Sequence, residues 1–183
     1  IDRMQKRWNP IAEVAWQLEE ELGVSQVGVN LYLTPEVSSE NDSLRRNGEV
    51  RQGFEAHWDW MDVIVIQLSG RKRWSVARQP SVYLSNKDQK RKPTREELEQ
   101  LPRYSDFTLC PGDVLYIPRG HIHNASTVIF DNLDNGSVEG GLDLNSCPSY
   151  PKDSTLTELF TNRLNGPSLH LTFGLLQSNE CTI

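Results

Sequence analysis

A histidine and an aspartate two residues apart, His57 and Asp59, precede a very apolar run of the chain. On a β-strand, residues two apart point to the same side, with Cα atoms roughly 6.5 Å apart. Neutral imidazole and carboxylate together suit a first-row divalent metal. The pair alone is weak evidence, because a single histidine is more often a core or surface residue. Asp62, three residues after Asp59, would face the opposite side and is interpreted as structural.

A third ligand must come from elsewhere in the chain, which contains only four histidines: His57, His121, His123 and His170. Two of these, His121 and His123, follow the expected strand after the sequence PGD at 111–113. Either one completes a face of two histidines and one carboxylate. Such a face leaves coordination positions open and is typical of non-haem Fe(II) oxygenases. The open positions suit a 2-oxo acid and dioxygen.

A cation follows the apolar run. Lys72 comes just after a Ser-Gly turn at 69–70, and the alternation of a returning strand would place it on the same face as Trp74. An ammonium inside the fold needs a partner, because an unpaired buried charge is costly. The far carboxylate of a keto acid would supply one. From the pattern alone, a solvated cation in a hairpin is the favoured interpretation.

The elements that must position these residues are mostly short strands between Pro and Gly turns, as in a sandwich or small barrel. Strands are expected at 27–33, 61–68, 71–77, 114–117 and 168–173. The run 61–68 is apolar on both faces and is interpreted as fully buried.

Helices are expected outside the strands. One should begin with Asn9 as its cap and end at Gly23, and another should open with the capping box at 94–97. A third is expected at 155–164. The polar segments 36–52 and 131–153 are interpreted as loop insertions.

Composition limits the class of protein. The 183 residues are expected to form a single domain, residues 1–183, which the initial isoleucine suggests is a fragment of a longer protein. A net charge of −6 disfavours direct binding of nucleic acid, and no apolar run is long enough for a membrane span. The three cysteines, Cys110, Cys147 and Cys181, are odd in number and widely spaced, which favours a reducing compartment over a disulfide framework.

Four stretches together resemble the JmjC-type ribosomal oxygenases, a cupin-fold branch of Fe(II)- and 2-oxoglutarate-dependent enzymes. They are VNLYLTP at 29–35, GFEAHWDWMDVIVIQLSGRKRW at 53–74, LCPGDVLYIPRGHIHNAS at 109–126 and SLHLTFG at 168–174. They span most of the chain in the expected order. The resemblance implies a mainly β fold, the double-stranded β-helix or jelly roll of cupins, with peripheral helices.

The family's metal triad, carried over residue by residue, falls on His57, Asp59 and His123, which are therefore the implied catalytic residues. His121 falls where the family usually has a residue that is not a ligand. The implied cofactors are Fe(II) and 2-oxoglutarate.

The resemblance also implies the rest of the pocket. Lys72 would bind the far carboxylate of 2-oxoglutarate, and His170 would lie near the metal and the co-substrate. Asn30 and Tyr32 are implied as pocket residues that contact co-substrate and substrate. The family often has a serine at the position of Gly174, where it contacts the substrate side chain. A hydroxyl that could orient an imidazole is therefore absent here, which weakens the case for histidine as the substrate.

The implied activity is hydroxylation of a side chain of a protein, most simply a basic ribosomal protein, in the nucleus or nucleolus or otherwise in the cytoplasm. Demethylation of a methylated lysine, on a histone or another protein, uses the same chemistry and stays open. A non-catalytic cupin binding module also stays open, and a zinc-dependent cupin enzyme is weaker because it gives Lys72 no role. Regions outside this chain could form a homo-oligomer.

Overall fold

The computed structural model describes residues 1–35, 52–83, 92–100, 104–127 and 167–177. The helices are η1 (Met4–Lys6, a 3-10 turn), α1 (Asn9–Leu22) and α2 (Arg95–Gln100). The strands are β1 (Gln26–Thr34), β2 (Gln52–His57), β3 (Asp62–Ser69), β4 (Lys72–Ala77), β5 (Tyr104–Leu109), β6 (Val114–Ile117), β7 (His123–Thr127) and β8 (Ser168–Leu176).

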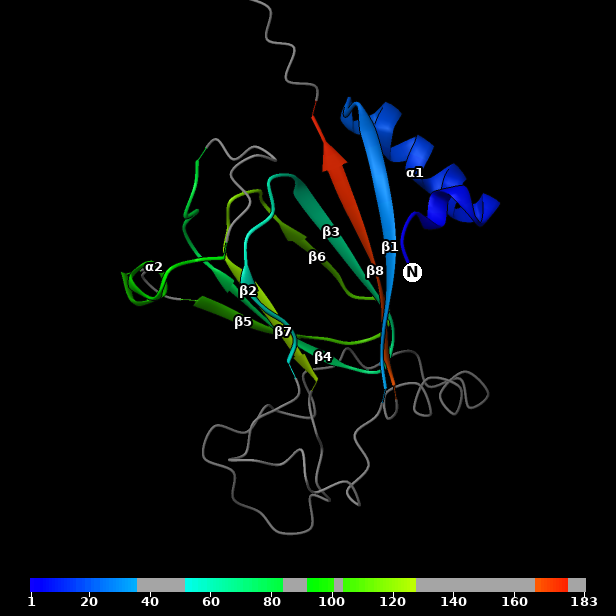
Figure 1. The fold of residues 1–183 in the computed structure, drawn as a ribbon. Coiled ribbons are helices and arrows are strands. Elements are labelled where there is room, and N and C mark those ends of the chain that lie inside the picture. The colour runs from blue at the N-terminus through cyan, green and yellow to red at the C-terminus, as the bar shows by residue number, and fades with distance from the viewer. Residues whose placement is uncertain (36–51, 84–91, 101–103, 128–166, 178–183) are drawn as a thin grey trace, which may run out of the picture.

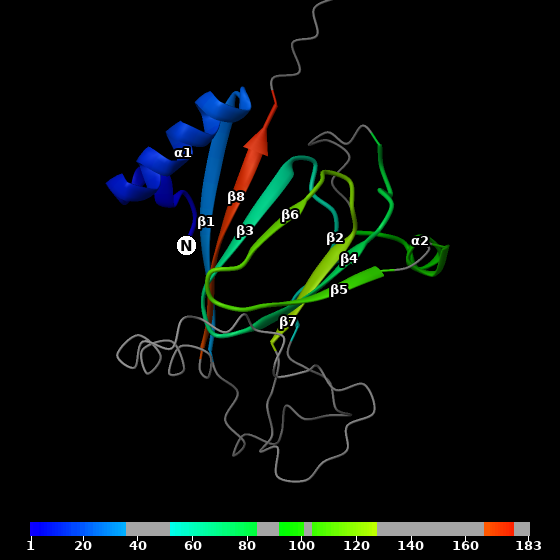
Figure 2. The same ribbon diagram turned by 180° about the vertical axis from the view of Figure 1, so that it is seen from behind.

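The strands form two four-stranded sheets, with the orders β1-β8-β3-β6 and β2-β7-β4-β5. All their pairings are antiparallel. The first sheet carries α1 on its outer side, along β1 and β8, and the second sheet carries α2 at its far edge (Figure 1). The view from behind shows both sheets diverging from the region where β3 passes into β4 (Figure 2). The prediction of a mainly β jelly roll with peripheral helices is confirmed.

The middle of β3, an inner strand of the first sheet, is apolar on both faces because both faces are covered. The run 61–68 is not fully buried as expected, however, since Leu68 near the end of the strand is 36% exposed. Val63 and Val65 point between the two sheets, where they pack with Trp74 of the second sheet. Ile64 and Ile66 point the other way, toward the cluster that α1 forms against β1 and β8. This two-sided packing explains why the strand reads as a continuous apolar run rather than an alternating one.

The helices are close to those expected. α1 ends at Gly23, whose φ of 63° is the left-handed conformation that favours glycine. Its first residue is Asn9, however, so the N-cap is Trp8 and no side-chain cap forms. The capping box before α2 is present, with the Thr94 N–H donating to Glu97 Oε2 at 2.7 Å and the Glu97 N–H donating to Thr94 Oγ1 at 3.2 Å.

Some expectations differ from the structure or lie beyond it. Gln52, placed in the first loop insertion, begins β2 instead, while the rest of that segment, 131–153 and the helix at 155–164 lie outside the described residues. Cys110 is disulfide-bonded, which the preference for a reducing compartment over a disulfide framework did not predict. Within the described ranges, no helix is long and apolar enough to cross a membrane.

Candidate active site

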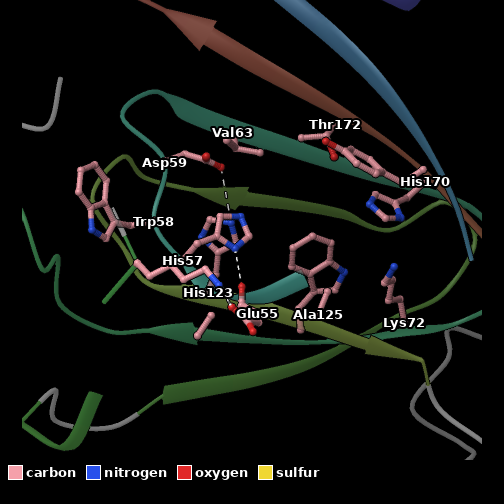
Figure 3. Close-up of a pocket in the computed structure, with 14 residues that line it drawn as sticks. Glu55, His57, Trp58, Asp59, Val63, Lys72, His123, Ala125, His170 and Thr172 are labelled. Atoms are coloured by element: carbon pink, nitrogen blue, oxygen red, sulfur yellow. Dashed lines mark hydrogen bonds and ion pairs between the residues drawn. The ribbon is translucent and has the colours of Figure 1, made fainter. Parts of the chain in front are cut away.

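Three side chains converge between the sheets. The candidate ligand atoms of His57, Asp59 and His123 all lie within 4.8 Å of one another. His57 is the last residue of β2 and His123 the first of β7, and the two are partners in the antiparallel register. Asp59 Oδ2 lies 3.6 Å from His123 Nε2 (Figure 3). The geometry therefore brings together the two histidines and one carboxylate that the sequence predicted.

Asp59 is held differently from the expectation. The strand ends at His57, so Asp59 lies in the connection to β3 rather than on a regular strand. Its carbonyl accepts a hydrogen bond from the Gly120 N–H at 2.8 Å. Trp58, which lies between His57 and Asp59 in the sequence, is only 1% exposed and packs with Ile122. This anchor and the backbone bond fix the carboxylate where strand pairing does not.

The two histidines have a defined tautomer. His57 Nδ1 lies 2.8 Å from the carbonyl of Glu55, and His123 Nδ1 lies 3.0 Å from the carbonyl of His121. A carbonyl can only accept, so each ring carries its proton on Nδ1 and offers the Nε2 lone pair. Burial, and next the neighbouring His57, lower the pKa of His123, which keeps it neutral. The donor set fits a divalent first-row metal.

The other histidine of this stretch, His121, is not part of the cluster. Its Nδ1 lies 3.2 Å from the carbonyl of Pro118 and 3.4 Å from that of Arg119. The sequence left open whether His121 or His123 is the third ligand. Of these two, only His123 faces His57 and Asp59 in the structure.

The cluster opens into a cavity of about 740 Å³ between the two sheets. Side chains from β1, β2, β3, β4, β7 and β8 line it, together with Lys92 before α2. The three converging side chains lie at one end, and Lys72 and His170 lie at the other (Figure 3). The cavity thus has a metal-ligating end and a cationic end.

Lys72 is buried, with 3% of its surface exposed. Its Nζ donates to Thr34 Oγ1 at 3.0 Å, and no carboxylate within the described part of the chain pairs with it. Burial lowers the pKa of Lys72 to about 8. The interpretation as a solvated hairpin cation is wrong, because β4 starts at this residue and its alternation turns Lys72 and Trp74 inward. An ammonium so placed fits an anionic ligand.

The walls near Lys72 come from facing positions of two paired strands. Tyr32 of β1 is the register partner of His170 of β8, and their rings stack at 5.1 Å. Burial, and next the charge of Lys72, lower the pKa of His170 to about 3, so its imidazole is neutral. His170 Nδ1 is buried and has no hydrogen-bond partner within the described ranges.

Asn30 is placed less directly than expected. Its Nδ2 donates to Tyr32 Oη at 3.5 Å, and its Oδ1 accepts from the Arg3 N–H at 3.2 Å. Asn30 is not among the residues that line the cavity, whereas Tyr32 is. The N-terminal segment takes up the Asn30 side chain, which leaves Asn30 behind Tyr32 rather than in the pocket.

Trp74 and Thr172 line the cavity and were not assigned a role from the sequence. The Trp74 ring lies 5.6 Å from that of His170 and 6.2 Å from that of His123, so it joins the two ends of the cavity. Its Nε1 is buried without a partner in the described part of the chain. Strand alternation could have identified both residues, because Trp74 lies two positions after Lys72 and Thr172 lies two positions after His170.

Two further residues of the sequence argument lie outside the cavity lining. Asp62 accepts hydrogen bonds from Tyr116 Oη at 3.1 Å and from the Arg119 N–H at 2.9 Å, which confirms it as structural. Gly174 is covered by Met61, because a Cβ added to it would lie 2.5 Å from the Met61 sulfur.

Comparisons with known proteins agree with this geometry. Residues 6–134 match the family described as "JmjC domain". Ribosomal oxygenase 2 of Rattus norvegicus is 38% identical over 115 residues, covering 61% of this chain and 21% of the relative. The bifunctional lysine-specific demethylase and histidyl-hydroxylase NO66 of Drosophila melanogaster is 38% identical over 110 residues, covering 56% and 14%. The chain thus spans about a fifth or less of these relatives.

One solved structure supports the fold. The X-ray structure of E. coli ycfD aligns with a TM-score of 0.52 at 16% identity, covering 98% of this chain and 33% of that one. At this identity the likeness shows the arrangement of the strands and no more.

Proposed function

Because the chain belongs to the JmjC domain family, we propose that it is the catalytic domain of an Fe(II)- and 2-oxoglutarate-dependent dioxygenase that hydroxylates a protein side chain. The observation that carries the proposal is the presence of two complementary groups in one cavity. The cluster of His57, Asp59 and His123 lies at one end, and the buried ammonium of Lys72 lies at the other.

The cluster would hold ferrous iron through His57 Nε2, His123 Nε2 and an oxygen of Asp59. The chemistry that such a centre supplies is activation of dioxygen, coupled to decarboxylation of 2-oxoglutarate and ending in hydroxylation of a C–H bond. The carbonyls of Glu55 and His121 would keep both imidazoles oriented, since each accepts the Nδ1 proton of one ring.

Lys72 would bind the far carboxylate of 2-oxoglutarate. Its pKa of about 8 keeps it largely protonated at neutral pH, and an approaching carboxylate favours the charged form further. Thr34 holds the ammonium in place through its hydroxyl. Trp74 Nε1 and His170 Nδ1, which have no hydrogen-bond partner among the described residues, would offer further polar contacts along the co-substrate.

The walls between the two ends would keep water away from the reaction. Val63, Trp74 and Ala125 line the cavity with apolar surface and belong to one buried cluster. Tyr32 would bound the substrate side, with Asn30 orienting its hydroxyl from behind. Gly174 would contribute indirectly, by leaving room for Met61.

A protein substrate is proposed from the relatives, two of which are named as a ribosomal oxygenase and a histidyl-hydroxylase. A basic ribosomal protein would suit the net charge of −6. With such a substrate, the proposed site of action is the nucleus or nucleolus, with the cytoplasm as the alternative. The loop insertions 36–51 and 131–153 belong to the same proposed domain.

Lysine demethylation is the second candidate, because the NO66 relative carries both activities in its name. Hydroxylation of an N-methyl group would release formaldehyde, whereas hydroxylation of a carbon of the side chain would leave a stable product. A non-catalytic binding module is the third candidate. It would predict no turnover of 2-oxoglutarate even with iron and ascorbate.

The test is incubation with Fe(II), ascorbate and 2-oxoglutarate, with and without candidate basic proteins. We expect succinate formation and a mass increase of about 16 Da on the substrate, from one added oxygen, both lost in His57→Ala and retained in His121→Ala. Release of formaldehyde from methyl-lysine peptides, without a stable mass increase, would show that the activity is demethylation rather than hydroxylation. Absence of succinate under all conditions would overturn the enzymatic proposal.

A further inference from the structure

An acidic side chain lies at the exposed edge of the cavity, near its metal-ligating end. Glu55 and His57 lie two residues apart on β2, and both line the cavity. The Glu55 carbonyl accepts the Nδ1 proton of His57 at 2.8 Å. The Glu55 side chain is 71% exposed, so its carboxylate is open to solvent at the edge of the cavity.

A cation of the same chain already occupies this carboxylate. The ammonium of Lys92, on the segment before α2, forms an ion pair with Glu55 and also lines the cavity. The Lys92 side chain is 77% exposed. Apart from Asp59, which belongs to the metal cluster, Glu55 is the one acidic residue among the described lining residues. The exposed carboxylate of Glu55 thus already pairs with one positive charge at the edge of the cavity.

We propose that Glu55 selects a cationic substrate side chain, arginine or lysine, and that Lys92 holds the Glu55 carboxylate until the substrate cation displaces it. The inference rests on the proposed function and narrows its substrate, because the names of the relatives leave histidine open as well. A neutral imidazole would break the pair between Lys92 and Glu55 without replacing its charge.

The exchange is energetically feasible because both partners are exposed. Replacing one cation by another on a solvated carboxylate requires little desolvation, so the selectivity is modest and weakens with salt. A guanidinium can bind a carboxylate through two parallel hydrogen bonds, which an ammonium cannot. Arginine is therefore the favoured member of the class.

Binding of three synthetic peptides tests the proposal without turnover. They share one sequence and carry arginine, citrulline or histidine at the centre; citrulline keeps the shape of arginine without its charge. Fluorescence anisotropy would give Kd in the absence of 2-oxoglutarate for the wild type, Glu55→Gln, Lys92→Gln and Glu13→Gln. Glu13→Gln is the matched control, because it removes one exposed negative charge from α1.

We expect the arginine peptide to bind the wild type more tightly than the other two. Glu55→Gln should weaken it by about two- to fivefold, the range for exposed ion pairs, and Lys92→Gln should tighten it. The citrulline peptide and the Glu13→Gln protein should show neither effect. Equal binding of the arginine and citrulline peptides to the wild type, or equal weakening of both by Glu55→Gln, would overturn the inference. If the protein prefers the arginine peptide but forms no succinate in the turnover assay described above, the result counts against the proposed function and not against this inference.

Discussion

His57 and His123 face each other as register partners across β2 and β7, with ring centroids 4.4 Å apart. A slip of one residue in this pairing would turn one imidazole to the opposite face of the sheet. The separation of the two candidate ligands is therefore a property of strand register, while Asp59 is added by the connection that follows β2. The site should form only when the second sheet is correctly paired.

Metal binding should stabilise the fold through these ligands. At a free Mn²⁺ concentration of 100 times Kd, the free energy of unfolding should rise by about 2.7 kcal/mol, which corresponds to roughly 5–10 °C in Tm. His123→Ala and Asp59→Ala should abolish the rise, measured by differential scanning calorimetry. His121→Ala is the control and should keep it, since His121 lies in the same stretch but outside the cluster. Loss of the effect in His121→Ala as well would place the metal elsewhere.

Lys72 should lower the stability of the empty protein. Its folded pKa of about 8 lies below the ordinary 10.5, so between these values the unfolded chain binds more protons and stability rises with pH. Below pH 8 the full cost remains, on the order of 3 kcal/mol. Lys72→Met should therefore unfold at higher urea than the wild type at pH 7, by up to that amount, and the difference should vanish near pH 10.5.

The same variant should lose its response to co-substrate. Added 2-oxoglutarate should raise the Tm of the metal-loaded wild type but not that of Lys72→Met, because the ammonium that would bind the far carboxylate is gone. Arg73→Met is the matched control, since Arg73 is the next residue of β4, points outward and pairs with Asp106 on the surface. An unchanged response in Lys72→Met would remove Lys72 from the co-substrate site.

The sequence predicted what depends on strand alternation. The shared face of Lys72 and Trp74 followed from their separation of two residues, and the apolar run 61–68 was placed correctly within one residue. Alternation could not say whether the end of a strand is buried, which is why Lys72 was first interpreted as solvated. That depends on the packing of a second sheet, and no local pattern encodes it.

The remaining differences come from contacts between distant segments. Asn30 shares a face with Tyr32, as expected, but the backbone of Arg3 takes up its side chain. The pair of Glu55 and Lys92 joins segments 37 residues apart. Such contacts depend on how loops cross the sheet openings, which the hydrophobic period of a strand does not describe.

His170 should make the protein sensitive to acid. The pKa of His170 in the folded protein, about 3, lies below the ordinary 6.5. Between these pH values the imidazole is therefore protonated in the unfolded chain but neutral in the folded protein. Stability should fall as pH falls through this window, by up to about 1.4 kcal/mol per pH unit from this group. His170→Gln should flatten the pH dependence of the free energy of unfolding, measured by urea titration between pH 4 and 6.5. A second variant, His170→Asn, should agree, and an unchanged slope in both would show that the imidazole titrates normally.

Gly174 and Met61 should be energetically coupled. A Cβ at Gly174 would lie 2.5 Å from the Met61 sulfur, so Gly174→Ser must displace the methionine and should cost about 1–3 kcal/mol of stability. In the double variant Met61→Val, Gly174→Ser, the new side chain fills space that the methionine leaves, and the loss should be smaller than the sum of the single losses by about 1 kcal/mol. Gly28→Ser is the matched control, because Gly28 pairs with Gly174 in the sheet and a Cβ there meets nothing within 4 Å. Strictly additive losses in urea unfolding would show that Met61 does not occupy the space over Gly174.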